Sequence, residues 1–123
     1  MRDVYTIGYQ GITLAHLRKL MRENGIDLIV DVRSRPWSRF GYQEFNRKNL
    51  EEKLRGKYQW WGDRLGGFGC RITKKAIADL DALAQEKTVC LMCFENDPDD
   101  CHRYRKIGVK LEALGRELAH ILD

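Results

Sequence analysis

Two short runs of the chain place charged or nucleophilic side chains directly after apolar residues: IVDVR at 29–33 and CLMCFE at 90–95. Side chains alternate along a strand, so Asp31 and Arg33 would share one face of the first strand. Cys93 and Glu95 would share one face of the second. Charges in a buried strand must be paired or reach water, so the first pair is either an internal ion pair or part of a ligand site. We expect a site in which Asp31 and Glu95 act as acid, base or electrostatic stabiliser.

A third group of reactive residues, Cys101, His102 and Arg103, follows the second run, and Cys101 falls in the first turn or two of an expected helix. Backbone N–H groups and the dipole at the start of a helix can activate a thiol. Cys101 or Cys93 is then a candidate nucleophile, with His102 as base and Arg103 as an anion contact. The other interpretation is that Cys101 is a buried helix residue, as free cysteines commonly are.

The loop after the first run mixes basic and aromatic side chains. Arg33, Arg35 and Arg39 surround Trp37, and Ser38 lies beside it. Such a mixture suits a phosphate group together with a stacked base. A solvated loop with Trp37 packed back on the domain explains the same residues equally well.

Two further motifs are less specific. The glycine-rich segment 65–69 contains Gly66 and Gly67, which would let a backbone approach a ligand closely. It lacks the strand-to-helix context of a phosphate-binding fingerprint, so a plain turn is the alternative. Cys90 and Cys93 have C-x-x-C spacing, but an odd spacing on a strand sends the two sulfurs to opposite faces. We therefore interpret Cys90 as a core residue and not as half of a zinc or redox pair.

Apolar periodicity divides the chain into alternating strands and helices. The expected strands cover 4–9, 27–33, 58–61, 88–95 and 117–122. Thr13 (14–24), Asn46 and Thr73 are expected to cap three helices, and a fourth is expected to start at Asp97-Pro98. This alternation predicts a three-layer α/β domain with a mostly parallel sheet of about five strands and helices on both faces. Ligands of such folds bind beyond the carboxyl ends of the strands, where both reactive runs end.

Composition narrows the class of protein. A length of 123 residues fits a single domain, 1–123, and 43% hydrophobic residues suffice for one core. The net charge of +4 permits an anionic partner without requiring one. No apolar run is long enough for a membrane span and the start lacks a signal-peptide pattern, so we expect a cytoplasmic protein. In that reducing compartment we expect its four cysteines to be buried thiols, ligands or reactive groups rather than disulfides.

Together these motifs resemble the family catalogued as domain of unknown function 488, over nearly the whole chain. The specific feature is D-V-R-x-x-P-x-S-R followed by C-x-E-x-x-x-x-x-C-H-R, with TIGY near the start. The resemblance implies a site at the matching positions Asp31, Arg33, Pro36, Ser38, Arg39, Gly66, Gly67, Cys93, Glu95, Cys101, His102 and Arg103. The family has a histidine or tyrosine after the first-strand glycine, here Tyr9, often followed by a serine that Gln10 replaces. It implies a fold and a site, without a settled reaction.

Our first hypothesis is an enzyme that acts on an anionic ligand, either a nucleotide or a nucleic acid. Arg33, Arg39 and Arg103 would hold phosphate, Trp37 would stack on a base, and Tyr9 would line the site. Under this hypothesis Arg33→Ala weakens ligand binding and leaves the fold intact. Nothing in the sequence requires a cofactor.

Two alternatives belong to other classes. One is a thiol-dependent transferase or hydrolase that uses Cys101 or Cys93, since the pattern is loosely similar to rhodanese-like domains. The other is a non-catalytic domain that binds a ligand, or a metal ion on Cys93, Glu95, Cys101 and His102, although this spacing is unusual for zinc.

Overall fold

The computed structural model describes residues 4–39, 41–66, 72–95 and 103–121, with the backbone alone for 103–105. The strands are β1 (Val4–Gly8), β2 (Leu28–Asp31), β3 (Tyr58–Trp60), β4 (Val89–Cys93) and β5 (Leu118–Ile121). The helices are α1 (Leu14–Asn24), α2 (Arg47–Lys53), α3 (Gly62–Leu65), α4 (Lys74–Glu86) and α5 (Val109–Ala113). A 3-10 turn, η1 (Gln43–Phe45), precedes α2, and a π-helical stretch, η3 (Arg103–Gly108), leads into α5.

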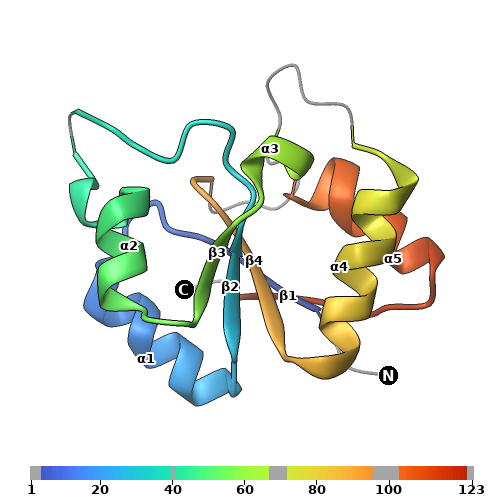
Figure 1. The fold of residues 1–123 in the computed structure, drawn as a ribbon. Helices are drawn as coiled ribbons and strands as arrows, with labels where there is room; N and C mark the ends of the chain where they lie inside the picture. Colours follow the sequence, from blue (N-terminus) through green and yellow to red (C-terminus); the bar gives the residue numbers. More distant parts are fainter. Residues whose placement is uncertain (1–3, 40, 67–71, 96–102, 122–123) are drawn as a thin grey trace.

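The five strands form one parallel sheet in the order β3-β2-β4-β1-β5. Helices α1 and α2 cover one face, and α4 and α5 cover the other (Figure 1). Each face has its own apolar cluster. Leu17, Phe45 and Leu50 pack on the α1/α2 face, whereas Leu80 and Leu111 pack on the α4/α5 face. The predicted three-layer α/β architecture is therefore confirmed.

Two of the helix caps expected from the sequence, Thr13 and Thr73, are present. Thr13 Oγ1 accepts the backbone N–H of His16 at the start of α1, and Thr73 Oγ1 accepts that of Ala76 at the start of α4. Such caps satisfy N–H groups that have no partner within the helix. Gly25 ends α1 in the left-handed conformation, with φ 64°, which glycine adopts without strain. The observed bounds of α1 are those predicted.

Two local features differ from the expectations. Asn46 precedes α2 as expected, but its side chain does not cap the helix. Instead, Oδ1 accepts the N–H of Ser38 (2.7 Å) and Nδ2 donates to the carbonyl of Ser38 (3.2 Å), which fixes the preceding loop. In addition, residues Gly62–Leu65, for which no helix is expected from the sequence, form a helical turn, α3, because Gly62 can pack directly against the end of β2.

Strand β4 lies between β2 and β1, but the elements that follow it in the described chain, η3 and α5, pack on the other face. After β1 and β2 the chain enters α1 and α2, whereas after β4 it continues to η3 and α5 (Figure 1). Adjacent parallel strands whose connections leave on opposite faces are where open α/β sheets bind their ligands. The carboxyl end of β4 is therefore the position at which the fold favours a site.

Candidate functional site

Asp31 and Arg33 form a buried ion pair at the end of β2. Arg33 Nε donates to Asp31 Oδ1 (2.8 Å), Nη2 donates to Oδ2 (2.7 Å), and the backbone N–H donates to Oδ1 (3.0 Å). The hydroxyl of Tyr58 donates a fourth hydrogen bond to Oδ2 at 2.5 Å. Asp31 is fully buried. Four hydrogen bonds use the acceptor capacity of a carboxylate, so no oxygen of Asp31 is left for a ligand.

The other donors of Arg33 connect β2 to two neighbouring segments. Nη1 donates to the hydroxyl of Tyr9 (3.0 Å) and Nη2 to the carbonyl of Phe45 (2.7 Å). Burial by itself lowers the pKa of Arg33, but the hydrogen bonds and charge of Asp31 outweigh it, so the pKa is raised. The structure thus contains the internal ion pair, which was one of the two interpretations of these residues.

Replacing Tyr58 by phenylalanine is expected to flatten the loss of stability at alkaline pH. Burial, followed by the charge of Asp31, raises the pKa of Tyr58 in the folded protein, above the value of about 10 in an unfolded chain. The folded state therefore holds the phenol proton more tightly, and this stabilisation is complete below about pH 10 and is lost as pH rises further.

Urea denaturation from about pH 8 to pH 11 tests this prediction. Between these limits the unfolding free energy of Tyr58→Phe should fall less steeply than that of the wild type. Tyr5→Phe is the control, because it removes a tyrosine from β1 that forms no hydrogen bond to a carboxylate of the described residues. If Tyr58→Phe and the wild type lose stability in parallel, the pKa of Tyr58 is not raised in the folded protein.

Cys93 and Glu95 do not share a face with the Asp31–Arg33 pair. Cys93 packs in the apolar cluster of the α4/α5 face, whereas Arg33 contacts residues of the α1/α2 face. The cause is the pairing of β2 with β4, which aligns Asp31 with Met92. Cys93 is one residue out of phase and points to the opposite side. The sheet therefore separates the two carboxylates that we expected to face a common cavity.

The cysteines in the described residues have different states. Cys90 is a buried thiol in the apolar cluster of the α1/α2 face, so its interpretation as a core residue is confirmed. Cys93 is disulfide-bonded, and its Sγ lies 3.4 Å from Oε2 of Glu95. The expectation of thiols rested on the expected compartment and is wrong for Cys93. A sulfur already bonded to another sulfur is not a resting nucleophile.

Several expected site residues cannot be placed. Gly67, Cys101 and His102 lie outside the described residues, as does the side chain of Arg103. Within the described ranges, no group of three or more His, Cys, Asp or Glu side chains could hold a metal ion. The metal hypothesis also involves Cys101 and His102, so this finding does not test it.

The loop between β2 and η1 presents its polar and aromatic residues to solvent. Trp37 is 63% exposed, so it does not pack back on the domain. Arg39 is also exposed, and Ser38 between them is held through its backbone by Asn46. The backbone of the loop is thus fixed at Ser38, and the side chains on either side of it, Trp37 and Arg39, are accessible to solvent.

An aromatic group that the sequence analysis missed lies at the carboxyl ends of β1 and β4. The rings of Tyr42 and Phe94 meet edge-on, with centroids 5.3 Å apart, and each residue is 37% exposed. Tyr9 is buried against both, at 5.6 Å and 5.3 Å, and stacks on Phe45 at 4.5 Å. We call Tyr9, Tyr42, Phe45 and Phe94 the aromatic platform.

The aromatic platform is connected to the buried ion pair. Tyr9 accepts a hydrogen bond from Arg33, and the guanidinium carbon lies 5.1 Å from the centroid of its ring. Tyr42 has φ 53°, a left-handed conformation that costs a non-glycine residue about 1–2 kcal/mol. Its hydroxyl accepts the N–H of Gly11 (2.8 Å), which ties it to the β1–α1 loop. The position of Phe94 immediately after β4 was the sequence feature that could have revealed this group.

Comparison with known proteins agrees with the motifs. The model of the family described as Domain of unknown function DUF488 matches residues 13–71 and 69–105. The chain belongs to this family. No curated protein and no solved structure matches it. The matched part of this DUF488 domain includes Asp31, Arg33 and Glu95, whereas Tyr9 precedes it.

Gly66 has a packing role in this DUF488 domain. A Cβ at Gly66 would lie 2.3 Å from the Oγ of Ser34 and 2.3 Å from the carbonyl oxygen of Gly62. Neighbouring protein atoms therefore occupy the space that the absent side chain leaves, and α3 can lie close to the end of β2.

Over the described residues, no helix of the domain has the length and apolarity needed to cross a membrane.

Proposed function

We propose that this domain is a small enzyme that binds a nucleotide, or a nucleotide unit of a nucleic acid, at the carboxyl end of β4. The observation that carries the proposal is the aromatic platform, whose half-exposed Tyr42 and Phe94 lie at the position where the fold favours a ligand. Exposed aromatic faces held by buried neighbours are surfaces on which bases stack.

Rigidity supports a binding role for the aromatic platform. Phe94 and Tyr42 rest on Tyr9, which stacks on Phe45 and accepts a hydrogen bond from Arg33. The Asp31–Arg33 pair therefore acts as a positioning element and not as a ligand contact. Side chains fixed before binding lose little conformational entropy when a ligand arrives.

Charge and chemistry are assigned to two residues that neighbour the aromatic platform in the chain, Arg39 three residues before Tyr42 and Glu95 directly after Phe94. Arg39 is exposed on the loop that carries Trp37 and can supply a phosphate contact. Glu95 is partly exposed, whereas Asp31 is fully buried. Glu95 is therefore the carboxylate of the two that a ligand can reach, and we assign it the acid–base role in hydrolysis or group transfer.

The test of ligand binding is Phe94→Ala. Loss of one stacking face should weaken the binding of AMP, GMP or a short single-stranded oligonucleotide by about 5- to 150-fold, which corresponds to about 1–3 kcal/mol. Isothermal titration calorimetry measures the change. Val109→Ala is the control, because Val109 is similarly exposed (47%) but lies on α5.

Three results separate the parts of the proposal. If no probe binds the wild type, or if Phe94→Ala and Val109→Ala weaken binding equally, the aromatic platform is not the binding surface. Product formation from a bound probe, followed by chromatography, tests catalysis. Glu95→Gln should then retain binding and lose turnover. Unchanged turnover would remove Glu95 from the reaction.

A further inference from the structure

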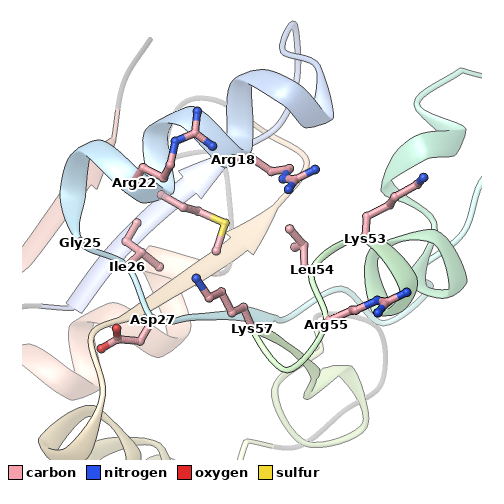
Figure 2. Close-up of a pocket in the computed structure, with 10 residues that line it drawn as sticks. Arg18, Arg22, Gly25, Ile26, Asp27, Lys53, Leu54, Arg55 and Lys57 are labelled. Carbon is pink, nitrogen blue, oxygen red and sulfur yellow. The ribbon is translucent and has the colours of Figure 1, made fainter.

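A basic cavity lies at the amino ends of β2 and β3, whereas the aromatic platform lies at the carboxyl ends of β1 and β4. It has a volume of about 570 Å³ and lies between the C-terminal half of α1, the start of β2 and the turn between α2 and β3 (Figure 2). Its charged lining consists of Arg18, Arg22, Asp27, Lys53, Arg55 and Lys57. Five cations thus face one carboxylate, and cavities of this volume accommodate ligands of nucleotide size.

The one carboxylate is already engaged. Asp27 Oδ2 accepts the backbone N–H of Thr88 (2.9 Å), at the start of β4. Among the described residues, no ion pair joins any of the five cations to an acidic side chain. All five are exposed. The positive charge in the cavity is therefore not neutralised by the described part of the chain.

Favourable interaction with the helix dipoles explains only part of the positive charge in the cavity. Basic residues in the last turn of a helix interact favourably with its dipole, and this accounts for Arg22 in α1 and Lys53 in α2. Carbonyls at the end of α1 already accept N–H groups from Gly25 and Ile26. Arg18 lies one turn earlier, so the dipole does not account for its position.

Arg55 and Lys57 are held by a tight turn after α2. The N–H of Lys57 donates to the carbonyl of Leu54 (2.8 Å), and Gly56 between the two cations has φ 74°. The turn therefore fixes the backbone from which both side chains extend. Figure 2 shows Lys57 reaching toward α1 from this turn and Arg18 reaching toward it from α1.

Apolar residues complete the cavity. Met21, Ile26 and Leu54 line it and are almost completely buried, at 5%, 6% and 5% exposure. Buried apolar side chains thus form the base of the cavity, and exposed lysine and arginine side chains form its rim. Such a combination suits a compact ligand with several negative charges more than a flat apolar molecule.

We infer that this cavity binds a small ligand that carries two or more linked phosphate groups, at a site separate from the aromatic platform. Arg18 and Lys57 contact the phosphates from opposite sides, and Arg22, Lys53 and Arg55 add to the positive field. The inference does not rest on the proposed function, because the two sites share no residue and lie at opposite ends of the parallel strands.

Calorimetric titration with inorganic triphosphate at low salt tests the inference. The double variant Arg18→Glu, Lys57→Glu should lose at least about 100-fold in affinity, since each charge-assisted hydrogen bond contributes about tenfold or more. Lys19→Glu, Lys48→Glu is the matched control. This control changes the net charge by the same amount, at exposed positions of α1 and α2 that lie outside the cavity. Its affinity for triphosphate should stay within about threefold of the wild type.

Additional titrations distinguish the possible phosphate-containing ligands. Inorganic triphosphate should bind more tightly than single inorganic phosphate. It should compete only weakly with a single-stranded oligonucleotide. Phe94→Ala should leave triphosphate binding unchanged. An absence of triphosphate binding to the wild type would overturn the inference. Equal losses in the two double variants would overturn it as well, because they would show a general effect of charge. Oligonucleotide binding much tighter than that of triphosphate, and lost in Arg18→Glu, Lys57→Glu, would replace a small ligand by a nucleic acid.

Discussion

Replacing Arg33 by alanine is expected to lower the free energy of unfolding by about 3–5 kcal/mol, because it leaves the charge of Asp31 buried without its partner. Asp31 would lose two side-chain hydrogen bonds, and Tyr9 and Phe45 would each lose a donor. Domains of this size have a total stability of about 5–15 kcal/mol. The variant is therefore expected to be partly unfolded at physiological temperature, which differs from the intact fold that the sequence alone predicts.

Urea denaturation at neutral pH measures this effect. Arg64→Ala is the control, because Arg64 pairs with Asp79 at a half-exposed position and lies over the ring of Trp61. That change should cost about 1 kcal/mol. A double variant, Asp31→Asn with Arg33→Met, should be more stable than Arg33→Ala, because it contains no unpaired buried charge. If Arg33→Ala costs no more than Arg64→Ala, the buried pair does not stabilise the end of β2.

The fold could be predicted because its determinants are local. The apolar spacing of Leu14, Leu17 and Met21 between Thr13 and Gly25 specifies both ends of α1. Strand lengths were less predictable: the run 27–33 was expected to be a strand, but β2 ends at Asp31. A strand ends where its neighbours stop pairing, and a single segment of sequence does not contain that information.

The candidate site was less predictable because it depends on the pairing of distant strands. Alternation within each strand was predicted correctly, since Cys90 and Cys93 do lie on opposite faces. The alignment of β2 with β4, which decides which residues of the two strands share a face, could not be predicted from the sequence. A shift of one residue in the alignment of Asp31 with Met92 would have put Cys93 on the same face as the ion pair.

The aromatic platform and the basic cavity were missed for a similar reason. Tyr9, Tyr42 and Phe94 come from three separate loops, and the cations from 18 to 57 each resemble an ordinary solvated residue. No motif joins either set along the chain. Their proximity follows from the order of the strands, which places β4 beside β1 and the turn before β3 beside the end of α1.

Gly62→Ala is expected to destabilise the domain by about 3 kcal/mol, although alanine favours a helix more than glycine does by about 1 kcal/mol. A Cβ at this position would lie 1.9 Å from the carbonyl oxygen of Arg33 and 2.4 Å from Nε1 of Trp60. These two atoms are joined by a hydrogen bond of 2.7 Å. The methyl group would therefore force α3 away from β2 and break the bond at the same time.

Gly25→Ala distinguishes this steric effect from backbone strain. Gly25 has φ 64° and no atom within 4 Å of an added Cβ, so its replacement costs only the left-handed conformation, about 1–2 kcal/mol. Thermal and urea unfolding should thus rank Gly62→Ala below Gly25→Ala in stability. The reverse order would show that α3 can move outward freely. In that case the end of β2, which holds Asp31 and Arg33, does not depend on close contact with α3.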